Sequence, residues 1–394
     1  MSDHYNVVVV GGGIQGVGVA QAAAAEGHSV LLIEKSDLAD GTSSKSSKLI
    51  HGGLRYLENA DFSLVRECLT EQAILLKIAP DLVKMRRFYI PVYESTRRSR
   101  AAIGAGLGLY YALAKFRKDS RPSVVRRSHW DQLDGLSTDN LKTVFSYADA
   151  QTDDRLLTQA VMRSAQNMEA QLLTSTRFLH ANIGDKGSEI SYLRDGEDHS
   201  CTADVLVNAG GPWVNEIAQK IMPNPEFQDV DLVGGTHIIL EGLVSKGVYY
   251  TESPRDGRAV FVMPWYGKTM VGTTERVFRD LPDLIKPTVA ENNYLLSILR
   301  HYFPAYNGVT LSDVTESWAG LRVLPKAKGH AFHRSREVIF KTDRKGRPRV
   351  LSIYGGKLTA YRATAQDVMA RIRPSLPDAS RRGFTDEIEL SLPT

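Results

Sequence analysis

The sequence predicts an α/β protein with two domains, one built on a parallel sheet and the other on a mixed or antiparallel sheet. Three observations predict this fold class. The chain opens with a strand, a glycine-rich turn, a helix and a second strand. Residues 230–280 alternate apolar and polar side chains between Gly, Asp and Pro breaks, which is typical of hairpins. The length of 394 residues is sufficient for two domains.

The first domain begins with a βαβ pattern. Residues 6–10 read NVVVV and predict an inner strand that is buried on both faces. Residues 17–26 are small and predict a helix, and residues 29–34 predict a second strand. We therefore expect a Rossmann-like nucleotide-binding unit in the first 34 residues.

The turn between the first strand and the helix carries the dinucleotide fingerprint. Gly11, Gly13 and Gly16 fit the pattern G-x-G-x-x-G: the first permits a tight turn, the second lets the backbone approach a pyrophosphate, and the third lets the helix pack closely. Glu34 follows the second strand and can accept hydrogen bonds from ribose hydroxyls, which disfavours a 2′-phosphate and so NADP. The alternative is a glycine turn that only packs.

The later elements follow from periodicity and turn residues. Apolar residues at helical spacing predict helices, and short apolar runs before Gly or Pro predict strands. We expect helices over 61–79, 149–170, 289–302 and 360–371, and strands over 88–93, 204–213, 235–240, 247–252, 259–264, 269–274, 317–322 and 350–353.

Composition excludes several classes. With 42% hydrophobic and 24% charged residues the chain is an ordinary globular protein, and a net charge of +4 does not indicate nucleic acid. The two cysteines, Cys68 and Cys201, favour a reducing compartment without disulfides. We expect a cytoplasmic protein with no signal peptide, no apolar run of roughly 18 to 20 residues that could span a bilayer, and no metal site of the zinc type.

The segment after Glu34 is the most specific part of the sequence. Residues 42–44 read TSS and residues 46–58 read SSKLIHGGLRYLE, so small hydroxyl residues and a Gly-Gly pair return along the nucleotide. This segment resembles the signature of the FAD-dependent (respiratory) glycerol-3-phosphate dehydrogenases, in the glycine/D-amino-acid oxidase (DAO) superfamily. The resemblance covers nearly the whole chain, and it implies a DAO-type two-domain flavoprotein that binds FAD. Family members also carry a C-terminal helical domain that has no counterpart here.

The resemblance implies how the chain is divided. A discontinuous FAD-binding domain would comprise residues 1–85, 148–225 and 318–394, and a substrate-binding domain residues 86–147 and 226–317. The cofactor-binding residues that it implies, together with the fingerprint, are Gly11, Gly13, Ile14, Gln15, Gly16, Glu34, Lys35, Thr42, Ser43, Ser44, Ser47, Lys48, Leu49, His51, Gly52, Gly53, Ala209, Gly210, Trp213, Gly355, Gly356, Lys357, Leu358 and Thr359.

The same resemblance implies the substrate site. Oxidation of a secondary alcohol needs a proton acceptor and a docking point for the anion, and arginine grips phosphate in a bidentate manner. The residues implied as catalytic are Arg55, His237, Arg322 and Lys357, and those implied to bind substrate are Arg55, Tyr56, His237, Arg322, Lys357 and Thr359. The implied reaction converts sn-glycerol 3-phosphate to dihydroxyacetone phosphate and passes electrons to quinone or another acceptor.

Each of these residues also has a structural interpretation. His237, the favoured base, lies on an apolar strand where a histidine is more often a satisfied core residue. His51 is expected to be structural or packed near the flavin, Arg322 could be a surface charge, and Lys357 could be a solvated cap before a helix.

Residues 95–127 form a basic amphipathic stretch. Three arginines precede an uncharged run over 101–114, and six cations follow it, with Asp119 as the one acid after the run. Such a helix with basic ends can lie in a membrane interface or be buried with solvated flanks. The resemblance favours peripheral contact with the cytoplasmic face of a membrane. The oligomeric state is not predicted.

Two departures from the family pattern leave the substrate open. Val323 follows Arg322 where the family has proline, and Gly234 stands where a basic residue is common. A second hypothesis is therefore an FAD-dependent oxidoreductase of another small anionic alcohol or amine, such as a 2-hydroxy acid, a phosphonate or an amino acid. A third is a flavin-binding protein or truncated subunit without turnover. A nicotinamide dehydrogenase is least favoured, because residues 42–58 would then have no purpose.

Overall fold

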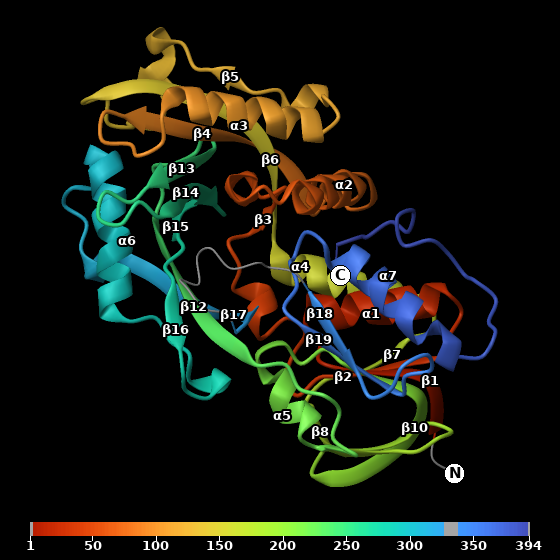
Figure 1. Cartoon of the computed structure of the whole chain (residues 1–394). Coiled ribbons are helices and arrows are strands. Elements are labelled where there is room, and N and C mark those ends of the chain that lie inside the picture. The colour runs from red at the N-terminus through yellow and green to blue at the C-terminus, as the bar shows by residue number, and fades with distance from the viewer. Residues whose placement is uncertain (1–2, 327–337, 393–394) are drawn as a thin grey trace.

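The computed structural model describes residues 3–326 and 338–392, apart from the side chains of Arg55 and Asn59 (Figure 1). It contains two mixed sheets, each with helices packed against it, which confirms the predicted α/β class. The helices are α1 (Ile14–Ala25), α2 (Phe62–Ile78), α3 (Arg100–Leu113), α4 (Asp154–Gln166), α5 (Val214–Ala218), α6 (Val289–Tyr302) and α7 (Tyr361–Ile372).

The first sheet has the nucleotide-binding topology. Its parallel centre runs β7-β2-β1-β10, β19 joins β10 in parallel, and β9 and β8 continue it in the antiparallel sense. Valines and leucines fill β1 and β2 because both faces are covered. The strands are β1 (Asp3–Val10), β2 (Val30–Ile33), β7 (Gln171–Leu173), β8 (Thr176–Ile183), β9 (Ser188–Arg194), β10 (Glu197–Asn208), β11 (Ile221–Met222), β18 (Ile339–Thr342) and β19 (Val350–Tyr354).

The second sheet is largely antiparallel, as the alternation over 230–280 predicts. β13, β14, β15 and β12 follow one another through antiparallel pairs, and β17 lies along the other edge of β12. The strands are β3 (Leu49–Ile50), β4 (Val83–Tyr93), β5 (Ser123–Val124), β6 (Leu141–Thr152), β12 (Val230–Glu241), β13 (Val248–Glu252), β14 (Ala259–Trp265), β15 (Lys268–Gly272), β16 (Arg276–Phe278) and β17 (Val314–Pro325).

The helices cover the sheets in separate groups. α1, α4 and α7 lie side by side against the first sheet and share one apolar core with β1 and β2 (Figure 1). α6 packs on β12 to β15, and α3 packs above β4 and β6. The strands β12 and β17 reach from the second sheet toward the first, and Leu321 on β17 accepts a hydrogen bond from Thr42 in the segment after β2.

Most predicted elements are found within a few residues, and one was misplaced. The helix predicted over 149–170 begins only at Asp154, because residues 149–152 continue β6 and pair with β4. A strand partner more than sixty residues away outweighs the local helical pattern there. β17 and the end of β6 belong to the second sheet, whereas the division of the chain into domains stays a prediction.

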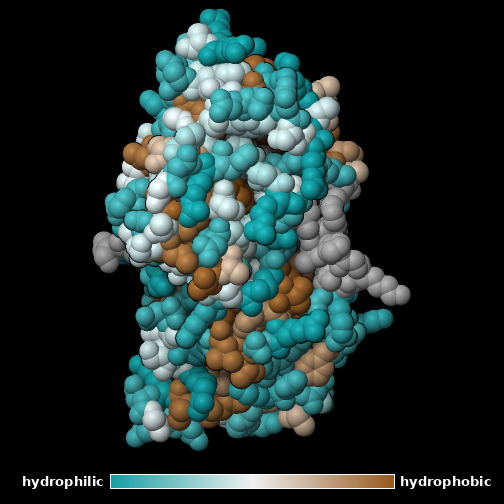
Figure 2. Space-filling model, turned by 90° about the vertical axis from the view of Figure 1, so that its left-hand side faces the viewer, coloured by the Kyte–Doolittle hydropathy of each residue, from teal (hydrophilic) through white to brown (hydrophobic). Residues whose placement is uncertain are grey.

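Apolar side chains also reach the surface. Figure 2 shows the face on the side of α6, where apolar residues gather in an interrupted band across its middle. The stretch from β16 to the start of α6 exposes Val277, Leu281, Leu284 and Val289.

Candidate active site

The glycine turn after β1 is closed against β10. Gly11 has φ +115°, and a Cβ on it would lie 2.5 Å from the carbonyl oxygen of Ala209. A Cβ on Gly16 would lie 1.9 Å from the carbonyl oxygen of Gly11. Only glycine therefore permits this approach, which brings the start of α1 beneath the ends of β1 and β10. The backbone N–H groups and the positive end of the dipole at such a helix start suit a pyrophosphate.

Polar side chains surround this turn. Glu34 accepts hydrogen bonds from the N–H of Gly12 (2.6 Å) and of Ser36 (2.9 Å). Ser43 Oγ accepts one from the N–H of Ile14, a residue of the first turn of α1 (2.9 Å). The predicted cofactor residues from three separate segments thus meet at one place.

A second cluster lies beside the first. Lys35 Nζ is 3.8 Å from the centroid of the Trp213 ring and 2.8 Å from Asp283 Oδ1, and Trp213 Nε1 donates to Asp283 Oδ2 (3.0 Å). The structure therefore brings the predicted Lys35 and Trp213 together. Asp283 was missed, since nothing in its local sequence marks it.

The segment over 42–50 is held by its own side chains. Thr42 Oγ1 donates to the carbonyl oxygen of Leu321 on β17 (2.7 Å). Lys48 has φ +60°, and its ammonium donates to the carbonyl oxygen of Ser44 and to Asp154 Oδ1, both at 2.6 Å. Leu49 is buried in β3.

The Lys48–Asp154 ion pair is deeply buried. The side chains of Lys48 and Asp154 are 6% and 0% exposed, and Asp154 also accepts from the N–H of Ser46 (3.0 Å). The Lys48 ammonium lies 5.3 Å from the centroid of the Trp318 ring. Lys48 therefore ties the segment over 42–50 to Asp154 at the start of α4. Asp154 is its counter-ion, and this residue was missed in the sequence analysis.

His237 lies in the middle of β12, opposite Trp318 of β17. Its ring stacks on the Trp318 ring with centroids 5.6 Å apart, and its Nε2 is 2.9 Å from Ser47 Oγ. Burial lowers the pKa of His237 to about 3, with the charges of Lys48 and Arg322 as further causes. The imidazole is therefore neutral near pH 7.

Arg322 lies on β17, on the same face as His237. Its partner across the strand pair is Val233, and the partner of Trp318 is His237, so the even spacing puts all four side chains on one face. The guanidinium is half-buried, lies 3.7 Å from Glu275 and donates to the carbonyl oxygen of Thr274.

The loop between β19 and α7 closes the site from the first sheet. Gly355 and Gly356 have positive φ, and a Cβ on Gly356 would meet the Gln15 side chain at 2.6 Å. Gln15 Nε2 donates to the carbonyl oxygen of Lys357 (3.2 Å). Leu358 is half-buried in the same loop.

The loop between β19 and α7 also brings the cation of Lys357 to the site. Lys357 Nζ is buried 4.7 Å from the centroid of the Tyr56 ring, and it has no hydrogen-bond partner within residues 3–326 and 338–392. Thr359 Oγ1 accepts from the N–H of His51 (3.2 Å), so these two residues join the loop to the segment after β3. Arg55 lies in the 3₁₀ turn Leu54–Asn59, but its side chain is outside the described part of the structure.

The residues present fit a dinucleotide cofactor whose ring system carries hydrogen-bonding groups. Buried polar atoms without a hydrogen bond are costly, and in the described residues four of them come from segments of this region. They are Gln15 Oε1, His237 Nδ1, Trp318 Nε1 and Lys357 Nζ. Together with the glycine turn and Gly210 after β10, they offer backbone for a pyrophosphate and polar atoms for a cofactor ring. No group of three or more His, Cys, Asp and Glu in the part described could hold a metal ion.

Comparison with known proteins identifies the family. The model of the FAD dependent oxidoreductases (DAO) matches residues 6–362. The chain is 37% identical to a glycerol-3-phosphate dehydrogenase of Pseudomonas aeruginosa, over 95% of this chain and 72% of that protein. It is 31% identical to an aerobic glycerol-3-phosphate dehydrogenase of Staphylococcus aureus, over 93% of this chain and 67% of that protein.

Solved structures agree with this assignment. The glycerol-3-phosphate dehydrogenase of Bacillus halodurans, complexed with FAD, superposes with a TM-score of 0.78 at 26% identity and covers 98% of this chain and 68% of its own. The L-alpha-glycerophosphate oxidase of Mycoplasma pneumoniae shares the fold, with a TM-score of 0.75 at 17% identity over 97% of this chain and 98% of its own. The family model over residues 6–362, these relatives and the glycine turn together show that the chain belongs to the FAD-dependent oxidoreductase family.

Proposed function

We propose that the protein is an FAD-dependent glycerol-3-phosphate dehydrogenase that oxidises sn-glycerol 3-phosphate to dihydroxyacetone phosphate. The relatives that cover most of the chain carry that name. The observation that carries the proposal is the ammonium of Lys357, which is buried beside the Tyr56 ring and makes no hydrogen bond to any described residue. A buried cation of this kind suits an anionic substrate.

The cofactor would lie between the glycine turn and the strand pair β12–β17. Gly11, Gly13 and Glu34 would hold its adenylate half, and residues of the β19–α7 loop its ring. When bound, FAD supplies a two-electron acceptor for the hydride that leaves the substrate carbon.

The protein's own residues would bind the substrate and take its proton. Arg55, Arg322 and Lys357 would hold the phosphate and the developing oxyanion, while Tyr56 and Thr359 would hydrogen-bond to the substrate. If Nε2 of His237 donates to Ser47, Nδ1 is left as an acceptor for the hydroxyl proton. Only the neutral ring can accept this proton. Burial keeps the ring neutral, but it also lowers the pKa to about 3, below the near-neutral pKa that suits a general base best.

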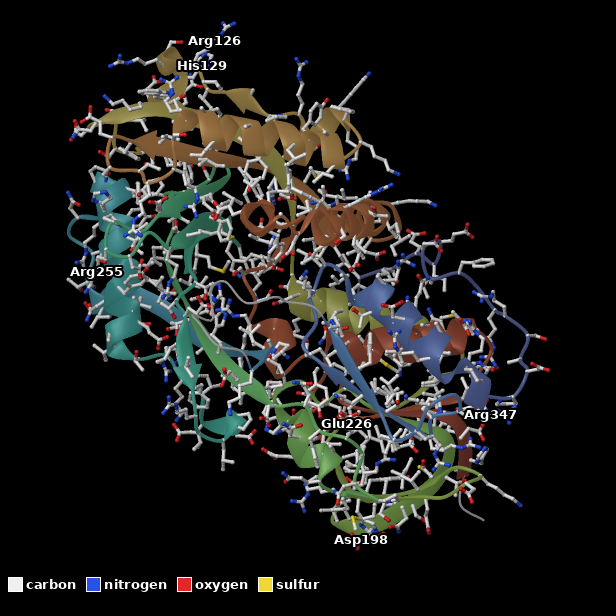
Figure 3. The ribbon with its side chains drawn as sticks, viewed as in Figure 1. Arg126, His129, Asp198, Glu226, Arg255 and Arg347 are labelled. Carbon is white, nitrogen blue, oxygen red and sulfur yellow. The ribbon has the colours of Figure 1, made fainter. Side chains whose placement is uncertain are left out.

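We infer that electrons pass to quinone or another acceptor and that the α3 region contacts a membrane surface. No helix in the described residues is long and apolar enough to span a bilayer. α3 exposes Leu109, the turn after it exposes Phe116, and Arg126 and His129 project from this end of the molecule (Figure 3). The exposed cations in α3 and its flanking segments are Arg97, Arg100, Lys115, Lys118, Arg121, Arg126 and Arg127.

Flotation with anionic vesicles tests the membrane contact. The protein should float with them at low salt and remain below at high salt, because charge provides much of the attraction. Failure to float at low salt would remove this part of the proposal.

An absorption spectrum tests the activity itself. The purified holoprotein should show an oxidised flavin spectrum that bleaches when sn-glycerol 3-phosphate is added without oxygen. Glycerol, which has the same carbon skeleton without the charge, serves as the matched control and should leave the spectrum unchanged at the same concentration. A flavin that stays oxidised with glycerol 3-phosphate, but bleaches with a 2-hydroxy acid or an amino acid, would redirect the proposal to that substrate.

A further inference from the structure

A buried carboxylate lies behind the site and takes no part in the chemistry described above. Asp149 is 1% exposed, in the last part of β6. Its Oδ2 accepts a hydrogen bond from the hydroxyl of Tyr110 on α3 (2.7 Å), and its Oδ1 accepts one from Nε2 of Gln72 on α2 (2.5 Å). Three elements that are distant in sequence thus meet at one carboxyl group.

The Tyr110 hydroxyl also touches the segment that leads to the substrate residues. It accepts a hydrogen bond from the N–H of Gly52 (2.8 Å), and a Cβ on Gly52 would lie only 2.6 Å from the same hydroxyl. Gln72 Nε2 donates to the carbonyl oxygen of Ile50 (2.9 Å). The backbone over 50–52 is therefore fixed through two side chains that are themselves fixed by Asp149.

The turn that presents Arg55 and Tyr56 comes directly after this fixed backbone. Gly53 has φ +74°, a left-handed conformation, and the 3₁₀ turn Leu54–Asn59 begins at the next residue. The ring of Tyr56 contacts the Lys357 ammonium at 4.7 Å. A shift of the Gly52 amide would consequently move two of the predicted substrate residues.

We propose that Tyr110 and Asp149 are positioning residues, which fix the Gly52–Gly53 turn and thereby place the 3₁₀ turn Leu54–Asn59, with Tyr56 on it, for the binding of an anionic substrate. The expected effect on catalysis rests on the proposed function. The expected effect on the Gly52 amide does not depend on it. Neither residue is expected to touch the substrate.

The ionised carboxylate matches this arrangement better than the acid. Both oxygens of Asp149 accept hydrogen bonds, one from the Tyr110 hydroxyl and one from Nε2 of Gln72. A protonated carboxyl would carry an O–H group on one oxygen, which would then face a donor instead of an acceptor. The other groups that face Asp149 are Tyr147 beside it on β6, Cys68 on α2 and Arg117 after α3. Burial raises the pKa of Asp149 to about 7, against the hydrogen bonds of Tyr110, Gln72 and the Gly52 backbone and the charge of Arg117.

Hydrogen exchange tests the positioning without reference to turnover. In the holoprotein, Tyr110→Phe should accelerate exchange of the Gly52 amide by about fivefold to tenfold, which is the effect of losing one hydrogen bond. Tyr111→Phe is the matched control, since its hydroxyl bonds the carbonyl oxygen of Phe116 at the end of the same helix. Equal exchange of Gly52 in Tyr110→Phe, Tyr111→Phe and wild type would overturn the proposal.

Kinetics test the consequence for the substrate. Tyr110→Phe and Asp149→Asn should raise KM for glycerol 3-phosphate by about tenfold and change kcat less, because the binding segment loosens while the proton acceptor stays in place. Wild-type KM should rise as the pH falls through about 7, whereas Asp149→Asn should behave at every pH as the wild type does in acid. The substrate phosphate also titrates, at about pH 6, but its effect on KM is the same for both proteins and cancels in the ratio of the variant's KM to the wild-type KM.

The outcomes separate the two proposals. If wild type does not oxidise glycerol 3-phosphate, the proposed function fails while the exchange of Gly52 still decides the positioning. If wild type is active but the pH profiles of wild type and Asp149→Asn run parallel, the positioning role is wrong. Circular dichroism checks that each variant is folded, and the nearly isosteric Asp149→Asn provides a second route if Tyr110→Phe does not fold.

Discussion

At the scale of single residues, the site depends on two buried polar groups, the His237 imidazole and the Lys357 ammonium. His237 is held neutral by burial between Ser47 and the Trp318 ring, and Lys357 is a cation without a described hydrogen-bond partner. A neutral imidazole can accept a proton, and an ammonium can bind an anion. The residue-scale predictions concern how each state is maintained.

His237→Asn should slow flavin reduction by about 10²-fold to 10³-fold, the usual effect of removing a general base. The flavin content should be unchanged, because asparagine keeps a polar group beside Ser47. Rapid mixing with glycerol 3-phosphate under anaerobic conditions measures the rate. His180→Asn, an exposed histidine on β8, is the control, and equal rates in the two variants would exclude His237 as the base.

Asp154→Asn should reduce the free energy of unfolding by about 3–5 kcal/mol, because it leaves the buried Lys48 ammonium without its counter-ion. Asp40→Asn breaks the exposed pair with Arg155 and should cost less than about 1 kcal/mol. Urea unfolding of both variants gives the comparison. Similar costs for the two substitutions would show that the Lys48–Asp154 pair does not stabilise the segment.

Asp149 should make stability depend on pH in a defined direction. Its pKa is about 7 in the folded protein and 3.8 as the ordinary value, so the folded state holds a proton that the unfolded state has released between these limits. Stability relative to Asp149→Asn should therefore fall as the pH rises from about 4 to about 7 and stay level above. If the urea midpoint of wild type instead rose relative to that of Asp149→Asn over this pH range, the raised pKa of Asp149 would be contradicted.

At the scale of elements, the glycine turn is where local sequence and structure agree best. Gly11, Gly13 and Gly16 stand together in the sequence and so predict the turn. A Cβ on Gly16 would strike the backbone of Gly11, and a Cβ on Gly11 would strike the backbone of Ala209 after β10, whereas a Cβ on Gly13 would lie 3.1 Å from Ser43 Oγ. Lys48–Asp154 and Tyr110–Asp149 could not be predicted in this way. Lys48 and Asp154 are 106 positions apart, and Tyr110 and Asp149 are 39 positions apart. Both contacts depend on strand pairings that the local pattern does not encode.

Gly16→Ala should abolish FAD binding, because its Cβ would lie 1.9 Å from the carbonyl oxygen of Gly11 and force the turn open. Gly108→Ala on α3 is the matched control, since nothing lies within 4 Å of its added Cβ. Alanine should stabilise α3 there by about 0.5–1 kcal/mol. Flavin absorbance relative to protein absorbance in the purified variants measures the first effect, and a full flavin content in Gly16→Ala would contradict the account of the turn.

At the scale of the whole molecule, the site is assembled from both sheets. β1, β10 and β19 bring the glycine turn and Lys357, and β12 and β17 bring His237 and Arg322. Recurrent local patterns predicted the two sheet types and the glycine turn, whereas His237, Arg322 and Lys357 were implied by the family resemblance. Asp283 and Trp318 were missed as site residues, since their roles arise only where distant segments meet.

The most direct test of the cation-centred site is the preference for glycerol 3-phosphate over glycerol in flavin reduction, measured in wild type and Lys357→Met. Wild type should reduce its flavin with glycerol 3-phosphate far faster than with glycerol, and Lys357→Met should lower this ratio by about 10²-fold while retaining FAD. A ratio that is unchanged in Lys357→Met would contradict the claim that this buried ammonium recognises the substrate anion.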